Sequence, residues 1–249
     1  MPEALPPSGV VLPPGQGDAE ALAAARRALR VQMLATEHWS LLATRGLSWN
    51  ESFARAGMFL SLLSGAVVSL ALVAQATAFG AGFVVFALLI LPVVLFVGLA
   101  TFIRLLEINN EDYVWVRGMN RLRGAYLEVD PEIEKYFITG TTEDAAGIFK
   151  TFGSDEQTHF DAGWFHGFVT TPATIAFVDA MVAAVLASIA VVQLNAGAKD
   201  MTPVAAVGVI VFILTFAVLG YWAYRSQTMA ALTFEIHRDS KETEPPAQS

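Results

Sequence analysis

The chain has 249 residues, of which 55% are hydrophobic and 15% are charged, and its formal net charge is -8. A soluble domain is typically nearer a quarter charged, so this composition argues against an ordinary soluble enzyme. It also excludes a disordered or collagen-like chain, and the acidic balance excludes nucleic acid as a partner. The composition indicates an integral membrane protein that resides in the lipid bilayer.

The N-terminal part is predicted to lie outside the membrane. Residues 1–17 are rich in Pro and Gly and are expected to form a disordered tail. Residues 18–55 are predicted to form an amphipathic helix, capped by Asp18 and ending at Gly46, and a lead-in to the first span. In that lead-in, Ser48 and Glu51 have the spacing of a capping box, which predicts the start of the membrane helix.

The first transmembrane hairpin is predicted over residues 56–104. No Asp, Glu, Lys or Arg occurs between Ala56 and Ile103, and this stretch is long enough for two spans because one needs about 20 residues. Polar residues and glycines between 75 and 82 predict the turn, which places the helices at 56–76 and 82–104.

Residues 105–166 are predicted to form a small helical layer in the cytoplasm. The second span continues as an amphipathic helix to about Glu128, and Asp130 with Pro131 ends it and opens another helix. The segment 141–144 caps a third short helix that ends near Gly153. Arg117 and Arg121 share one helix face, where they could bind a phosphate or an acidic partner, but pairing with local acids is the simpler interpretation.

The second transmembrane hairpin is predicted over residues 167–225, followed by a polar cytoplasmic tail at 226–249. The third span carries one charge, Asp179, and the fourth, from Met201 to Tyr224, carries none. Residues 195–200 form the predicted turn. The expected fold is therefore an all-α, multi-pass membrane protein with four transmembrane helices in two hairpins.

The basic residues predict the orientation of the chain. With four spans, both termini and residues 105–166 lie on one side, which holds fourteen Lys and Arg residues, whereas only Lys199 lies on the other. Because cytoplasmic loops carry an excess of Lys and Arg, both termini are expected in the cytoplasm and the chain in the cell membrane.

Asp179 is the main candidate for a functional residue in the membrane. It lies about 18 Å along the third span, near mid-bilayer, where a carboxylate is costly. It could line an ion or proton pathway. Alternatively, it is a neutral structural residue that is hydrogen-bonded to a hydroxyl on a neighbouring span; the candidate partners are Ser61, Ser64, Ser69 and Thr215.

Two further sets of residues suggest contacts or ligands. Small residues recur every fourth position on the first and third spans and predict helix-packing seams: Ser61, Gly65, Ser69, Ala180, Ala184 and Ser188. Before the third span, His159, Asp161 and His166 could bind a divalent ion, although their spacing matches no established metal motif. His166, beside two aromatic residues, is more simply an interfacial residue.

No motif for catalysis or for a cofactor is present, so we expect neither an enzyme nor a cofactor. A membrane enzyme stays open as an alternative, and only the cluster at 155–166 could supply its site. Two other functions are favoured. The first is an oligomeric pore or ion pathway that uses Asp179. The second is a membrane-embedded scaffold or signalling protein whose 105–166 layer binds a cytoplasmic protein partner. A homo-oligomer is expected, because one four-helix bundle leaves little room for a solute path.

Overall fold

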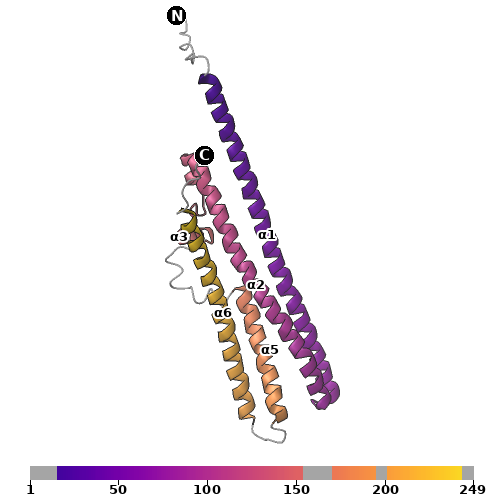
Figure 1. Cartoon of the computed structure of the whole chain (residues 1–249). Helices are drawn as coiled ribbons and strands as arrows, with labels where there is room; N and C mark the ends of the chain where they lie inside the picture. The colour runs from indigo at the N-terminus through magenta and orange to yellow at the C-terminus, as the bar shows by residue number, and fades with distance from the viewer. Residues whose placement is uncertain (1–15, 154–169, 195–200, 243–249) are drawn as a thin grey trace, which may run out of the picture. The chain divides into compact units, whose positions relative to one another are not determined.

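The computed structural model describes residues 16–153, 170–194 and 201–242, and all regular structure in these ranges is helical. The elements are α1 (Gln16–Thr77), α2 (Ala81–Val129), the 3₁₀ helix η1 (Pro131–Tyr136), α3 (Ala145–Thr151), α5 (Thr171–Leu194) and α6 (Thr202–Glu242) (Figure 1). This confirms the predicted all-α class.

Four of these helices, α1, α2, α5 and α6, are long and apolar enough to cross a membrane. Each contains an 18-residue window of high hydropathy with at most two charged residues. Their number agrees with the four predicted spans, and they indicate a multi-pass membrane protein.

The predicted end of the first helix at Gly46 is wrong, because α1 runs without a break from Gln16 to Thr77. A glycine inside a helix costs about 1 kcal/mol, which contacts on either side can offset. Arg45 and Trp49 both bind Asp112 of α2. Glu51 binds Arg104 of α2 instead of a helix start. Asp18, the predicted N-cap, lies instead inside the first turn of α1. A carboxylate there is stabilised by the positive end of the helix dipole.

The predicted turn between the first two spans is confirmed. Ala78 and Phe79 adopt left-handed backbone conformations, with φ of 48° and 58°, and the N–H of Gly80 donates to the carbonyl of Thr77 at 2.8 Å. The two helices end at Thr77 and begin again at Ala81, within one residue of the predicted bounds.

The chain divides into two compact units. The polar unit comprises the described residues up to Thr44 together with 116–153, and the apolar unit comprises 45–115, 170–194 and 201–242. In the apolar unit, a buried core includes Phe59, Val94, Phe102, Leu105 and Ile175.

Helices α5 and α6 lie side by side in the apolar unit (Figure 1). The rings of Phe177 and Phe212 meet edge to face, with centroids 5.3 Å apart. Ser188 approaches Gly208 so closely that a Cβ at Gly208 would lie 2.6 Å from its hydroxyl oxygen. The two helices therefore contact each other through both large and small residues.

In the polar unit, local caps shape the chain after α2 as the sequence predicts. The Asp130 side chain accepts from the N–H of Glu132 at 3.0 Å, and Pro131 begins η1. Asp144 caps α3 by accepting from the N–H of Gly147 at 3.0 Å. Gly153, with φ of 76°, follows the end of that helix.

A buried side chain, Asn120, attaches the 140–151 segment to α2. Its amide donates to the carbonyl of Thr142 at 2.9 Å, and its oxygen accepts from Thr151 at 2.7 Å and from Arg123 at 2.8 Å. Asn120 is fully buried, so these bonds satisfy polar atoms that would otherwise be costly.

Helix α6 is longer than predicted. The fourth span was expected to end at Tyr224 and to be followed by a polar tail, whereas the helix continues to Glu242. Residues 229–232 are Met, Ala, Ala and Leu, all strong helix formers, which favours this continuation. The predicted N-terminal tail, 1–17, is wrong at its last two residues, because Gln16 and Gly17 begin α1. The rest of the predicted tails, 1–15 and 243–249, lies outside the described residues.

Candidate functional site

Asp179 of α5 lies in a junction with α1 and α2. Its side chain is fully buried, and neither carboxyl oxygen has a hydrogen-bond partner among the described residues. Gly98 of α2 makes room for it: a Cβ on Gly98 would overlap Oδ1 of Asp179 and lie 2.7 Å from its Cγ. The same Cβ would lie 2.8 Å from Cε2 of Phe59 on α1. The carboxyl group therefore sits where a larger residue on α2 could not be accommodated.

The contacts of Asp179 also locate it along the spans. Gly98 precedes Arg104, at the end of the predicted second span, by six residues, or about 9 Å at 1.5 Å per residue. In the other direction, Gly98 lies about 25 Å from the first residue of α2, Ala81. Asp179 is therefore nearer the charged end of the apolar unit than the mid-bilayer position estimated from the sequence.

The hydroxyl groups suggested as partners of Asp179 do not supply its hydrogen bonds. Ser61, Ser64 and Ser69 each donate to the carbonyl four residues earlier on α1, at 2.8 Å. With both oxygens of Asp179 unpartnered among the described residues, Thr215 does not bind it either. The hydrogen-bonded structural role that the sequence suggests is thus absent from this packing.

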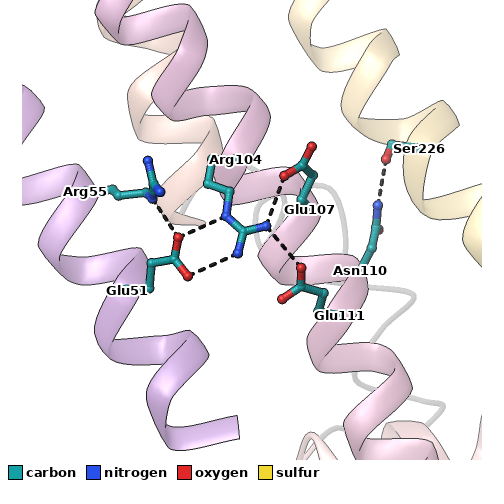
Figure 2. Close-up of polar contacts among 7 residues, drawn as sticks. All are labelled: Glu51, Arg55, Arg104, Glu107, Asn110, Glu111 and Ser226. Atoms are coloured by element: carbon teal, nitrogen blue, oxygen red, sulfur yellow. Dashed lines mark hydrogen bonds and ion pairs between the residues drawn. The ribbon is translucent and has the colours of Figure 1, made fainter. Parts of the chain in front are cut away.

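An ionic cluster of five residues joins α1 and α2 near the start of the first span (Figure 2). The guanidinium group of Arg104 binds both carboxylate oxygens of Glu51 at 3.0 Å. Its third nitrogen donates to Glu107 and to Glu111, each at 3.0 Å. Arg55 adds a bond of 2.8 Å to Glu51. One arginine therefore gathers three carboxylates at the edge of the apolar helices.

A second ion pair joins the same helices with the charges exchanged. Arg45 of α1 donates to both oxygens of Asp112 on α2, at 2.6 and 3.2 Å, and the indole N–H of Trp49 donates to Asp112 at 3.3 Å. The Asp112 side chain is only 8% exposed. Because α1 offers a base at 45 and an acid at 51, the two contacts together favour one register of α1 against α2.

Asn110 of α2 extends these polar contacts to α6. Its amide donates to the hydroxyl of Ser226 at 2.8 Å, next to the ionic cluster (Figure 2). Three helices of the apolar unit thus carry polar contacts at one end. This is the arrangement expected where spans leave the lipid, since charged groups are costly within it.

Glu51 gives the ionic cluster a pH dependence. Hydrogen bonds, first from Arg104 and then from Arg55, lower the pKa of Glu51 from 4.5 to about 2. Because the pKa is lowered in the folded state, Glu51 contributes stability above pH 4.5, and this contribution is lost as the pH falls towards about 2.

We expect Glu51→Gln to flatten the fall in stability between about pH 5 and about pH 3, because the variant has no carboxylate to protonate. Thermal unfolding of the detergent-solubilised chain, followed by circular dichroism across this pH range, measures the effect. Glu20→Gln, at an exposed position of α1, is the control and should retain the wild-type slope. A wild-type slope in Glu51→Gln would contradict the assignment.

The two predicted small-residue seams differ in their surroundings. On α5, Ala180 is fully buried, while Ala184 and Ser188 face Gly208 of α6. On α1, Ser61 and Gly65 are exposed and Ser69 is half-buried. A Cβ on Gly65 would meet nothing within 4 Å among the described residues. The α1 seam is thus uncovered within the described chain.

The possible metal ligands His159, Asp161 and His166 lie outside the described residues. Within the described ranges, no group of three or more His, Cys, Asp or Glu side chains could hold a metal ion. The two helical arginines are described, and both bind Glu143: Arg117 at 3.3 Å and Arg121 at 2.6 and 2.7 Å. Their predicted pairing with local acids is confirmed.

The polar unit contains an open groove between α1 and α2, with a volume of about 510 Å³. Its lining residues are Arg26, Leu29, Arg30, Met33, Leu34, Glu37 and Leu122. Leu29 and Met33 are 57% and 64% exposed, so an apolar floor faces solvent. The groove was not predicted from the sequence, although the spacing of residues 26, 30, 33 and 37 places them on one helix face.

Comparison with protein-family models, curated proteins and solved structures found no match to this chain. Its function is therefore inferred from the sites themselves. The Asp179 junction contains a fully buried carboxyl group in the apolar unit. The α1–α2 groove is an accessible apolar surface in the polar unit.

Proposed function

We propose that the chain is a scaffold or signalling protein of the cell membrane, with both termini and the polar unit in the cytoplasm. The observation that carries this proposal is the open apolar groove of the polar unit. Exposed apolar floors bordered by charged residues are typical of surfaces that bind other proteins. The excess of Lys and Arg on one side of the predicted spans supports the cytoplasmic placement.

The burial of Asp179 favours this function over an ion pathway. A residue that lines a path for ions must be reached by water, whereas Asp179 is 0% exposed and packs against Phe59 and Gly98. A pore formed between copies of the chain would also be lined by residues on the outer surface of each copy. Asp179 is on the inside.

An oligomeric pore remains a second candidate because the Asp179 carboxyl group has no partner. An unpartnered buried polar group calls for an explanation, and intramembrane acids commonly mark ion or proton routes. In this case, opening of the junction among α1, α2 and α5 would have to admit water to Asp179.

We further propose that the chain associates with itself in the membrane through α1. The exposed residues Ser61 and Gly65 would let the helix of a second copy approach closely. Because the chain has no cysteine, Ser61→Cys introduces a single thiol. Disulfide cross-linking of Ser61→Cys should give dimers, whereas Phe96→Cys, on an exposed position of α2, should not.

Two measurements distinguish the scaffold from the pore. A photoreactive residue at position 33, in the groove floor, should give one discrete adduct in intact cells, and Leu29→Glu should abolish it. The purified chain in liposomes should give no K⁺ or H⁺ flux above that of empty vesicles. Flux that Asp179→Asn abolishes, without an adduct at position 33, would overturn the scaffold in favour of the pore.

A further inference from the structure

We propose that the α1–α2 groove binds an amphipathic helix that carries an acidic residue at one end of its apolar stripe and a basic residue three turns away. This inference rests on the proposed scaffold function and specifies the chemistry of the partner. It derives from the charges at the two ends of the groove, which sequence patterning had not singled out.

The dimensions of the groove suit a helix. Arg26 and Glu37, which lie at its two ends, are eleven residues apart on α1, or about 16 Å. Eleven residues make just over three turns, so the two side chains share one helix face. Between them lies an apolar floor of Leu29, Met33 and Leu34 from α1, with Leu122 from α2. A third helix placed there would cover three turns of exposed apolar surface, which is the geometry of helix-in-groove recognition.

The two ends of the groove carry opposite charges that are not neutralised. Arg26 and Glu37 have no ion-pair or hydrogen-bond partner among the described residues. By contrast, Arg30, which lines the middle, binds Glu128 at 2.6 Å. The two terminal charges are therefore exposed and available to pair with an acid and a base at matching separation on a bound helix.

A second copy of the chain is the less suitable occupant. Copies inserted in one membrane with the same orientation run their α1 helices in the same direction. In a parallel, in-register pair, Arg26 would face Arg26 and Glu37 would face Glu37, and like charges oppose association. An antiparallel pair would match the charges but conflicts with a shared membrane orientation. The charge pattern thus favours a different protein.

Synthetic helical peptides of 18 residues test the proposal. All carry the same leucine stripe and differ only in two flanking residues spaced eleven positions apart: Glu with Lys, Glu with Glu, or Lys with Lys. Binding to the full chain in nanodiscs is measured by fluorescence anisotropy, with empty nanodiscs as the blank. A fourth peptide, residues 22–41 of this chain, tests for a second copy.

The wild-type chain should bind the Glu/Lys peptide roughly fivefold more tightly than either like-charged peptide, a modest factor because the terminal charges are exposed. Arg26→Glu makes both ends acidic and should transfer the preference to the Lys/Lys peptide. Arg27→Glu, next to Arg26 but outside the groove lining, is the matched control and should retain the wild-type order. Met33→Glu should weaken the binding of all three peptides at least tenfold.

Three results would overturn the proposal: no binding of any helix, an order of affinities that Arg26→Glu leaves unchanged, or tightest binding of the 22–41 peptide. The last would assign the groove to a second copy. If the photoreactive residue at position 33 still gives its cellular adduct in either of the first two cases, the scaffold function stands and only the partner chemistry fails. In the third case the adduct must contain a protein other than this chain for the scaffold function to stand.

Discussion

Gly98→Val is expected to destabilise the chain by about 1–3 kcal/mol, the usual cost of forcing extra atoms into a packed core. The valine side chain would collide with the carboxyl group of Asp179 and with the ring of Phe59, each held by a different helix. Both groups would have to shift to accommodate the valine, which disturbs the packing among α1, α2 and α5. The midpoint of thermal unfolding in detergent, followed by circular dichroism, measures this effect.

Gly220→Val provides the matched control because it makes the same change in another apolar helix, α6. A Cβ at Gly220 would meet nothing within 4 Å among the described residues, so the unfolding midpoint should move little. In addition, Gly98→Ala should be less harmful when combined with Asp179→Ala, which removes the overlapping oxygen. Equal destabilisation by valine at positions 220 and 98 would show that the junction is not packed as described.

Arg45→Met should cost about 2–3 kcal/mol of stability, because it leaves the carboxylate of Asp112 nearly buried without its main partner. The expected cost lies below that of a fully buried pair, since the Arg45 side chain is 23% exposed and Trp49 continues to donate to Asp112. Chemical unfolding of the chain in detergent, monitored by tryptophan fluorescence, gives the change in free energy.

Arg55→Met is the control for loss of an arginine from the same helix. The Arg55 and Glu51 side chains are 43% and 36% exposed, and such pairs contribute at most about 1 kcal/mol. Combining Arg45→Met with Asp112→Asn should recover part of the loss, because the unpaired carboxylate is then removed. The assigned role of the Arg45–Asp112 pair fails if Arg45→Met is no more harmful than Arg55→Met.

The fold was largely predictable because membrane spans follow from local composition. An uncharged stretch of 48 residues interrupted near Gly80 has few alternatives to a helical hairpin. Caps such as Asp130 and Asp144 act on neighbouring backbone atoms and were also evident. The predicted helix end at Gly46 was wrong because it depends on contacts that are distant in sequence. Arg45 binds Asp112 and Glu51 binds Arg104, each more than 50 residues away, and these contacts favour a continuous α1.

The candidate sites were less predictable because they depend on which helix faces meet. The sequence singled out Asp179 as the lone charge in its span, but its packing against Gly98 follows from the register of α2 beside α5. Likewise, Arg26 and Glu37 form the ends of a groove only because Leu122 of α2 lies beside α1. The sequence did not distinguish Gly98 from the many other small residues in the spans.

The central claim, that four spans place the polar unit in the cytoplasm, is tested most directly by labelling single cysteines in intact cells. Because the wild-type chain has no cysteine, Phe79→Cys in the α1–α2 turn and Ile138→Cys in the polar unit each introduce a unique thiol. Both positions are well exposed, at 71% and 90%. A membrane-impermeant maleimide should label position 79 in intact cells and position 138 only after permeabilisation. Labelling of position 138 in intact cells would contradict the proposed orientation.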